Sequence, residues 1–295
     1  MTAIGFIGLG RMGAPMAACL AGAGHELAVL DKAEGAQTRF LGEHPAARAV
    51  QRPRDLAQES QVVITMLPAS ADVADVLYGT AGVLAGLKPG SLVIEMSSGA
   101  PARTQAFAAD VERIGGALID APVSGGVARA ASGELSIMVG GAAAAVERAR
   151  PILLAMGTSI LATGAVGTAH AMKALNNLVS AAGFMISVEA LLIGKRFGLD
   201  PAVMVDVLNA STGVNNSTQK KLKPFVLSRT FDSGFALDLM VKDLTIALGI
   251  ARDEGVAAPL AAQVRELWAA ALAAGAGGDH THAARFSERL AGIEL

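Results

Sequence analysis

The residues with the clearest chemistry stand near the start of the chain, where Gly8–Gly13 has the spacing GxGxxG. This loop follows the apolar run Ile4–Ile7 and precedes a helical pattern, which is the context in which such a spacing binds a dinucleotide. The first glycine permits a tight turn, the second lets a pyrophosphate approach the backbone, and the third allows close helix–strand packing. The N–H groups and partial positive charge of the helix N-terminus attract the phosphates. The alternative is a glycine-rich turn without a ligand. The predicted cofactor-binding residues of this loop are Gly8, Leu9, Gly10, Arg11, Met12 and Gly13.

Asp31 ends the second apolar run of the chain, Leu27–Leu30. A carboxylate at this position accepts hydrogen bonds from both adenosine ribose hydroxyls and repels a 2′-phosphate. Asp31 therefore favours NAD over NADP, although the adjacent Lys32 softens that discrimination. The alternative is an aspartate that caps the helix expected to begin at Ala33.

Lys173 and Asn177 are four residues apart in a long stretch with helical periodicity. They share one face of the expected helix, and Asn176 lies beside that face. Desolvation in a closed site lowers the pKa of a lysine and makes it a usable acid or base. An asparagine one turn away orients a substrate oxygen without adding charge. The pair predicts an acid/base site, and the alternative is an ordinary exposed lysine.

Ser124, Gly125 and Gly126 follow an apolar run late in the first half of the chain. A hydroxyl and two consecutive glycine N–H groups form a small anion-binding nest that suits a substrate carboxylate. The alternative is a glycine turn between a strand and a helix.

Two other features carry weaker chemistry. His280 and His282 form an HxH pair near the C-terminus, but no third metal ligand is evident. We therefore expect a solvated loop and no metal site. The single cysteine, Cys19, excludes an intramolecular disulfide and a CxxC motif, and it agrees with a reducing cytoplasm.

The elements that position these residues change character near the middle of the chain. Short apolar runs alternate with helical patterns up to about residue 163, which predicts βαβ units in a doubly wound parallel sheet. The expected strands are Ile4–Ile7, Leu27–Leu30, Val62–Met66, Leu92–Glu95, Ala117–Asp120 and Ser136–Val139. The expected helices are Met12–Ala23, Ala33–Leu41, Ala71–Leu77, Ala102–Ile114 and Ala143–Ala155. The fold class is thus α/β, with an N-terminal NAD-binding Rossmann-type domain over residues 1–163.

Residues 164–295 show helical patterns only, so we expect an all-α domain for substrate binding and dimerisation. It begins with a long helix between Gly167 and Gly198, in which apolar residues recur at helical steps. These are Met172, Leu175, Val179, Ile186 and Ile193. Further helices are expected at Pro201–Ala210, Ala236–Arg252 and Pro259–Ala274, with a short one at the C-terminus after the loop Ala273–Asp279.

Composition limits the function classes. The 295 residues carry a net charge of -2 and no run of five or more like charges, so a nucleic-acid partner is not expected. The charge-free run Pro151–Met172 contains Pro and several Gly, and it reads as helix end, strand, turn and helix start rather than a membrane span. The N-terminus has no basic segment before its apolar residues, so no signal peptide is expected.

Four motifs, taken together and in this order, resemble the β-hydroxyacid dehydrogenase family over nearly the whole chain. The family includes 3-hydroxyisobutyrate dehydrogenase, tartronate semialdehyde reductase and, more distantly, 6-phosphogluconate dehydrogenase. Gly5–Ala17 (GFIGLGRMGAPMA) looks like the cofactor fingerprint and Asp120–Gly126 (DAPVSGG) like the substrate motif. Gly164–Asn177 (GAVGTAHAMKALNN) looks like the catalytic motif, and Lys242-Asp243 like the C-terminal Lys–Asp pair.

The resemblance implies roles for individual residues. Lys173 is the general acid/base, and Asn177 with Asn176 holds the substrate, whose carboxylate binds Ser124, Gly125 and Gly126. Further cofactor contacts are implied for Met66, Leu67, Pro68, Ser98 and Lys242. From the sequence alone, Lys242 and Asp243 read as a solvated helical ion pair and Ser98 as a strand-end serine. The implied enzyme oxidises a small β-hydroxy acid with NAD, NADP being possible, and forms a homodimer or homotetramer in the cytoplasm.

Departures from the family pattern concern the substrate. The family usually has glycine where this chain has Ala169, and His170 follows. We expect His170 to begin a helix without a catalytic part, the alternative being contact with the substrate. A tryptophan common in 3-hydroxyisobutyrate dehydrogenases is absent near Asn215 and Asn216, which would make that side of the pocket more polar. Two other functions stay open: a non-catalytic NAD(P)-binding module, and an imine reductase on the same fold, which usually lacks the lysine.

Overall fold

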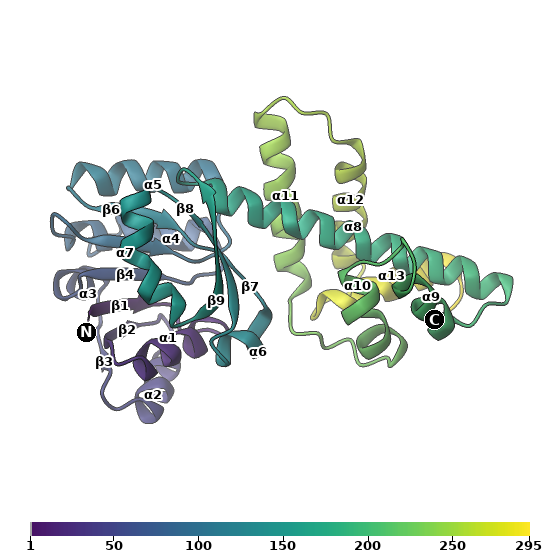
Figure 1. The fold of residues 1–295 in the computed structure, drawn as a ribbon, viewed down its shortest axis with the longest axis horizontal. Coiled ribbons are helices and arrows are strands. Elements are labelled where there is room, and N and C mark those ends of the chain that lie inside the picture. The colour runs from purple at the N-terminus through teal and green to yellow at the C-terminus, as the bar shows by residue number, and fades with distance from the viewer. Residues whose placement is uncertain (1) are drawn as a thin grey trace. The chain divides into compact units, whose positions relative to one another are not determined.

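The computed structural model describes residues 2–295 (Figure 1). The chain divides into two compact units, Met1–Lys173 and Ala174–Leu295, named unit 1 and unit 2 below. The division falls inside one long helix, α8 (Thr168–Phe197). The first six residues of α8, which end with Lys173, therefore belong to unit 1 and the remainder to unit 2.

Unit 1 contains a nine-stranded sheet with the order β3-β2-β1-β4-β5-β6-β8-β7, in which β9 also pairs with β8. β3 to β6 in this order are parallel, whereas β8 is antiparallel to β6 and β7. The order 3-2-1-4-5-6 is that of a doubly wound dinucleotide-binding sheet, whose ligand lies at the carboxyl ends of the strands. The strands are β1 (Ala3–Ile7), β2 (Glu26–Leu30), β3 (Arg48–Ala49), β4 (Val62–Thr65), β5 (Leu92–Glu95), β6 (Ala117–Asp120), β7 (Val123–Ser124), β8 (Leu135–Gly140) and β9 (Gly157–Gly164).

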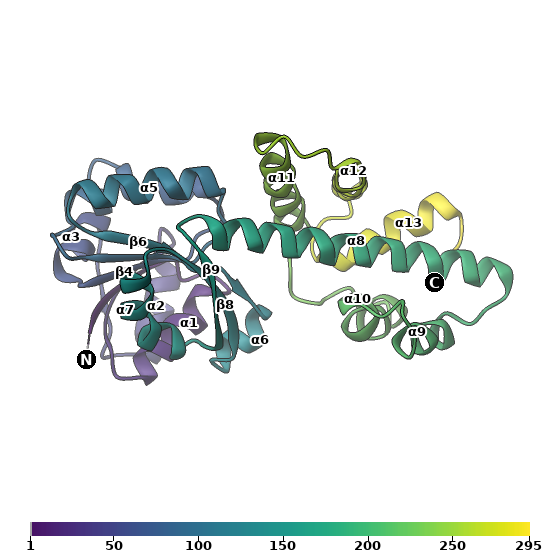
Figure 2. The same ribbon diagram turned by 45° about the horizontal axis from the view of Figure 1, so that its top comes forward.

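Helices cover both faces of this sheet (Figure 1 and Figure 2). β1 alternates between the two cores that result, because Phe6 packs in one and Ile7 in the other. One core includes residues of α1 (Gly13–Gly22), α2 (Glu34–Glu43), α6 (Gly126–Ala131) and α7 (Ala143–Leu154). The other includes residues of α3 (Pro53–Glu59), α4 (Ser70–Tyr78), η1 (Val83–Ala85) and α5 (Pro101–Arg113). The predicted α/β fold class is confirmed.

The sequence prediction missed only short or irregular elements of unit 1. β3 and β7 have two residues each, too few for a periodic pattern, and α3 and α6 have seven and six residues. The apolar run that resembles a membrane span contains the end of α7, all of β9, a turn and the start of α8, as expected.

Unit 2 is helical, with one isolated β-bridge between Ala236 and Asp279. Its core includes the fully buried Trp268, whose ring contacts Phe184 at a centroid distance of 5.6 Å. After α8 the elements are α9 (Pro201–Asn209), α10 (Asn216–Lys220), the π-helix η2 (Leu222–Leu227), α11 (Leu237–Asp253), α12 (Pro259–Ala273), η3 (His280–His282) and α13 (Ala283–Ala291). The prediction of a helical second half is confirmed.

α8 has two apolar faces. Phe184 and Val188 lie in the core of unit 2. The residues whose period predicted the helix lie outside that core: Val179, Ile186 and Ile193 are 73%, 61% and 72% exposed. The period therefore identified the helix correctly but marked its exposed face, since an exposed apolar stripe repeats like a core-facing one.

Candidate functional site

The Gly8–Gly13 loop joins β1 to α1 in the predicted strand–turn–helix context. Gly8 has φ +101° and donates its N–H to the Leu30 carbonyl at 2.9 Å. A Cβ on Gly8 would overlap the Met66 carbonyl, and one on Gly13 would overlap the Gly8 carbonyl. A Cβ on Gly10 would have no neighbour within 4 Å. Two glycines are thus required by the turn itself, and the middle one leaves its backbone open to a ligand.

Asp31 is part of the same turn. Its Oδ2 accepts the N–H of Leu9 at 2.6 Å, and its Oδ1 accepts the N–H of Ala33 at 2.8 Å. The carboxylate thus holds Ala33, the residue before α2, although that helix has no side-chain cap hydrogen bond, and it also fixes the glycine loop. Each oxygen keeps a further lone pair for a ribose hydroxyl, so the predicted ribose contact fits this geometry.

The other predicted cofactor contacts follow the ends of neighbouring parallel strands. Met66 donates its N–H to the Ile7 carbonyl at 2.9 Å, and Leu67 donates its N–H to Ser97 Oγ at 2.9 Å. Ser98 lies three residues after the end of β5 and is half-buried. Since β1, β4 and β5 are adjacent, these residues lie at the same sheet edge as the glycine loop.

Ser124, Gly125 and Gly126 form the turn from β7 into α6. Both glycines have positive φ, +141° and +70°. Ser124 is half-buried and the two glycines are exposed, so their polar groups are accessible to a ligand. The conformation agrees with the predicted anion nest as well as with a plain glycine turn.

Lys173 is buried, with only 8% of its surface exposed. The alternative of an ordinary exposed lysine is therefore wrong. Asn177, one turn later, is also buried and donates its side-chain N–H to Asp243 Oδ2 at 2.6 Å. Asn176 donates to Asn177 Oδ1 at 3.2 Å. α8 thus presents a buried lysine and a fixed amide on one face, as predicted.

Lys242 and Asp243 do not form a solvated pair on α11. Asp243 is 1% exposed. Its Oδ1 lies 3.5 Å from Lys242 Nζ, and its Oδ2 accepts the hydrogen bond from the Asn177 amide. The solvated interpretation fails because α11 packs this carboxylate against α8. Asp243 therefore orients Asn177 within unit 2.

The sequence did not predict the cluster of three buried polar side chains at the start of α8, which are Glu95, Asp120 and His170. Asp120 at the end of β6 accepts the N–H groups of Gly167 and His170 at 2.7 and 2.8 Å. Glu95 at the end of β5 pairs with the His170 ring at 2.9 Å. The signal available in the sequence was a carboxylate at the end of two successive strands, which parallel strands bring together at one edge.

Asn215 is engaged as the N-cap of α10. Its Oδ1 accepts the N–H groups of Ser217 and Thr218, and its Nδ2 donates to Ser187 Oγ at 3.0 Å. The Asn215 amide thus supports the helix start, while Asn216 is exposed.

The interpretation of the HxH pair as a solvated loop is wrong for His280. This ring is 1% exposed and stacks on Trp268, because η3 is inserted into the core of unit 2. Its Nδ1 lies 3.1 Å from the Phe235 carbonyl, and its Nε2 lies 2.6 Å from Lys221 Nζ. These partners satisfy a neutral ring. Among residues 2–295 no group of three or more metal-ligating side chains occurs.

We expect His280 to make the protein sensitive to acid. Burial and the Lys221 ammonium lower the pKa of His280 from 6.5 to about 4. Between pH 6.5 and about 4 the unfolded chain binds more protons at this ring than the folded chain does. As the pH is lowered through this range, the free energy of unfolding therefore decreases by up to about 3 kcal/mol. Urea unfolding at a series of pH values should show that the free energy of unfolding decreases less steeply with falling pH in His280→Asn than in the wild type. Equal slopes would contradict this account.

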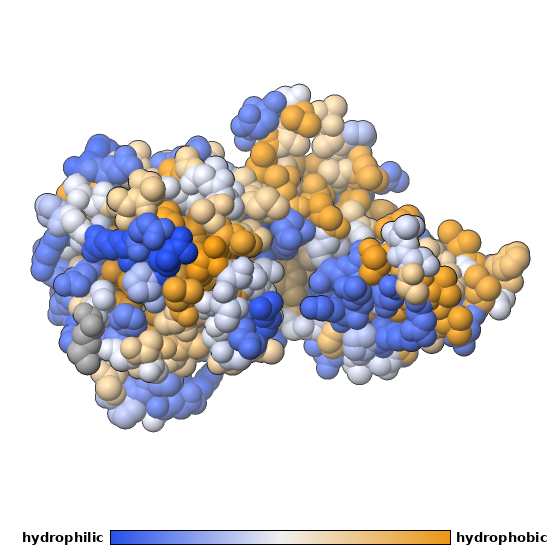
Figure 3. Space-filling model, in the orientation of Figure 1, coloured by the Kyte–Doolittle hydropathy of each residue, from blue (hydrophilic) through white to orange (hydrophobic). Residues whose placement is uncertain are grey.

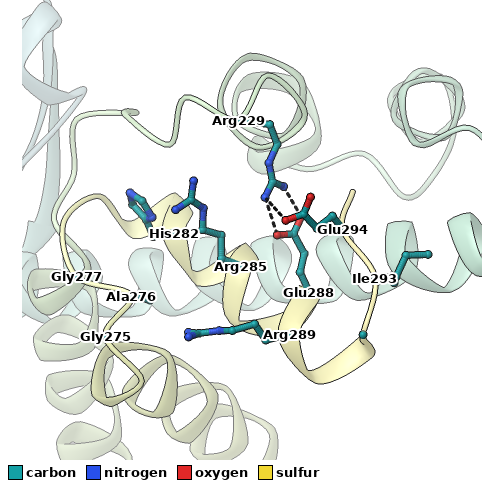
Figure 4. A pocket seen from close by; sticks show the side chains of 11 residues that line it. Arg229, Gly275, Ala276, Gly277, His282, Arg285, Glu288, Arg289, Ile293 and Glu294 are labelled. Carbon is teal, nitrogen blue, oxygen red and sulfur yellow. Dashed lines mark hydrogen bonds and ion pairs between the residues drawn. The ribbon is translucent and has the colours of Figure 1, made fainter.

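A cavity of about 780 Å³ lies in unit 2 beside α13 (Figure 4). Arg229 pairs there with Glu288 and lies 3.8 Å from Glu294, while the Arg285 guanidinium lies over the ring of Phe231. None of the residues predicted for catalysis or cofactor binding lines this cavity. We assign it no part in the chemistry.

Two models of known protein families together match almost the whole chain. Residues 3–164 match the model described as the NAD binding domain of 6-phosphogluconate dehydrogenase. Residues 167–287 match the model described as NAD-binding of NADP-dependent 3-hydroxyisobutyrate dehydrogenase. The two matches meet at the turn between β9 and α8.

Relatives are similar over nearly their full length. The 2-(hydroxymethyl)glutarate dehydrogenase of Eubacterium barkeri is 33% identical, over 99% of this chain and 97% of its own. The 3-sulfolactaldehyde reductase of Escherichia coli is 38% identical, over 94% and 92%. The structure of Mycobacterium tuberculosis 3-hydroxyisobutyrate dehydrogenase with L-serine has a TM-score of 0.90 at 33% identity, covering 97% of this chain and 99% of that one. The chain therefore belongs to the β-hydroxyacid dehydrogenase family.

Proposed function

We propose that this enzyme oxidises a small β-hydroxy acid to its semialdehyde or keto acid, or catalyses the reverse reduction, with Lys173 as general acid/base. The observation that carries the proposal is the burial of Lys173 on a helix that also carries Asn177, whose amide Asp243 holds. A buried lysine without a task is rare, because removing an ammonium group from water is costly.

The residues around the glycine loop fit a nicotinamide dinucleotide. Gly10 leaves room for the pyrophosphate, and the α1 N-terminus offers its N–H groups. Asp31 would accept the ribose hydroxyls, and the resemblance assigns further contacts to Arg11, Met12, Pro68, Ser98 and Lys242. When bound, the cofactor accepts or returns the hydride. NAD is the expected form, since the Asp31 carboxylate repels a 2′-phosphate, and NADP stays possible.

Each substrate-facing residue then has a distinct task. Lys173 removes the hydroxyl proton during oxidation and returns a proton to the carbonyl oxygen during reduction. Asn177, held by Asp243, orients that oxygen, and Asn176 supports it through their hydrogen bond. The substrate carboxylate binds the Ser124 hydroxyl and the N–H groups of the two following glycines.

A substrate panel tests this function. The purified enzyme is given 3-hydroxyisobutyrate, glycerate, threonate, L-serine, 3-hydroxypropionate and 2-(hydroxymethyl)glutarate, each with NAD and with NADP. We expect NAD-dependent formation of the reduced cofactor with at least one acid, and slower turnover with NADP. If every acid leaves both cofactors oxidised, and no semialdehyde is reduced, the chain is a non-catalytic NAD(P)-binding module instead.

We propose that the enzyme is a cytoplasmic homodimer or homotetramer that uses the outward face of α8 as an interface. Among residues 2–295, α8 is the one helix long and apolar enough to span a bilayer, yet half of its apolar window is buried inside the chain. Four of its exposed apolar side chains recur every seven residues along its outward face: Met172, Val179, Ile186 and Ile193. Figure 3 shows apolar surface over the later part of α8 and over α9. Contiguous patches of this kind mark contacts between proteins.

Charge on the outward face of α8 should separate the subunits. The Ile186 side chain is 61% exposed, so Ile186→Asp is expected to cost the single chain little stability. Light scattering should find the wild type at a multiple of the chain mass and Ile186→Asp shifted toward the monomer. Leu290→Asp on α13, where the side chain is 69% exposed, is the matched control and should not shift. A monomeric wild type would contradict the proposed assembly.

A further inference from the structure

The His170 ring lies in a fully enclosed polar site in unit 1. Its Nε2 is 2.9 Å from Glu95 Oε2 and 3.0 Å from the Ser97 carbonyl. Its Nδ1 is 2.8 Å from Thr104 Oγ1 and 3.9 Å from Asp120 Oδ2. The residue as a whole is 1% exposed. The ring is therefore held by β5, β6 and α5 at once, although it belongs to α8.

The partners indicate that both ring nitrogens donate. Glu95 and the Ser97 carbonyl are acceptors, so Nε2 must carry a hydrogen. The Thr104 hydroxyl lies 3.2 Å from the Ala100 carbonyl and donates to it. That hydroxyl is then free to accept from Nδ1. A ring that donates from both nitrogens is an imidazolium, and it stands between two carboxylates.

The electrostatic balance agrees with this protonation state. Burial disfavours the imidazolium, but the charge of Glu95, and to a smaller extent that of Asp120, outweighs it and raises the pKa of His170. Burial also opposes the Glu95 carboxylate, yet the charge and hydrogen bond of His170 lower the pKa of Glu95. Burial raises the pKa of Asp120, which contacts with His170 and Gly167 offset only in part.

A buried ion pair of this kind is a weak source of stability, because desolvation consumes most of the attraction. Its value lies in orientation, since the charged groups accept only one arrangement of donors and acceptors. His170 is fixed twice, by its ring and by its N–H on Asp120. Lys173 follows three residues later, so the two side chains are neighbours on the first turns of the helix.

We propose that His170 is a positioning residue for Lys173: paired with Glu95, it locks the first turn of α8 to the carboxyl ends of β5 and β6 and so fixes where the lysine amine stands. This inference rests on the proposed function of Lys173. It gives His170 a part in the reaction without contact with the substrate. Misplacing a reacting group by about 1 Å costs on the order of 100-fold in rate.

The first test needs no substrate. Amide hydrogen exchange of residues 167–173 is compared among the wild type, His170→Leu, His170→Gln and Val111→Ala, all without ligand. His170→Leu should speed exchange in this segment about tenfold or more relative to the strands of unit 1. His170→Gln should speed it less, because its amide still donates to Glu95. Val111→Ala removes buried methyl groups from α5 and should leave this segment's exchange unchanged relative to the strands. Unchanged exchange in His170→Leu would overturn the inference.

The second test separates positioning from a structural role. With NAD and the acid of the substrate panel that is oxidised fastest, His170→Leu should lower kcat about 10- to 100-fold with the KM for NAD unchanged. His170→Gln should recover part of that loss. Glu95→Gln should lower kcat similarly, and the double variant His170→Gln/Glu95→Gln no further. Faster exchange with wild-type kcat would overturn the inference. A wild type that turns over no hydroxy acid in the substrate panel would refute the proposed function, while the exchange result still reports on the anchor.

Discussion

Replacing Lys173 by methionine should lower kcat by about 10²- to 10⁴-fold, the usual contribution of a positioned acid or base. Methionine retains the length and apolar stem of the buried side chain, so the packing around α8 is kept. The hydroxyl proton of the substrate then has no acceptor when the hydride leaves. Steady-state kinetics should show this loss, and NADH titration should show unchanged cofactor affinity.

Two other lysine variants sharpen the result. Lys173→Arg keeps a long basic side chain but places there a group that does not release its proton, so it should be nearly as slow. Lys195→Ala removes a lysine from the last turn of the same helix and should retain wild-type kcat. Turnover by Lys173→Met at the wild-type rate would remove Lys173 from the mechanism.

Gly13→Ala should abolish cofactor binding at ordinary NADH concentrations. A Cβ at this position would overlap the carbonyl oxygen of Gly8, so the loop and α1 must move apart. Overpacking of this kind costs about 1–3 kcal/mol of stability. The displaced N–H groups also lose charge-assisted hydrogen bonds to the pyrophosphate worth about 1.5–3 kcal/mol each. Loss of two such bonds corresponds to a Kd raised by on the order of 100-fold or more.

Glycines nearby provide matched controls for this prediction. A Cβ on Gly10 has no neighbour within 4 Å, so Gly10→Ala should unfold like the wild type yet bind NADH more weakly, because the methyl group occupies the pyrophosphate's approach. A Cβ on Gly22, at the other end of α1, is equally unhindered. Gly22→Ala should change neither stability nor binding by much. Normal NADH affinity in both Gly13→Ala and Gly10→Ala would exclude this loop as the cofactor site.

Local sequence patterns were sufficient to predict the strand, glycine loop and helix that form the candidate cofactor site. The Gly8–Gly13 spacing, the apolar strand before it and the helix after it all depend on neighbours in sequence, and each was found as predicted. The comparisons likewise confirm the family and the reaction class inferred from the four motifs. The burial of Lys173 required the tertiary structure, because an apolar helix reads the same whether its lysine faces solvent or the interior.

The polar networks were beyond the reach of the sequence. Glu95, Asp120 and His170 come from three separate elements, and only the order of the parallel strands brings them together. His280 looked solvated among glycines and polar residues, yet its aromatic partners lie in distant helices. The apolar residues Val179, Ile186 and Ile193 of α8 show the converse limit, since periodicity predicts an apolar helix face without distinguishing a buried face from an exposed one.

Transfer of deuterium tests the central claim most directly. The panel acid that is oxidised fastest is labelled with deuterium on its carbinol carbon and given to the wild type and to Lys173→Met with NAD. We predict that the wild type places one deuterium on the reduced cofactor per turnover, and that Lys173→Met does so slower by about 10²- to 10⁴-fold. Reduced cofactor without deuterium, or equal transfer rates in the two proteins, would contradict hydride transfer assisted by Lys173.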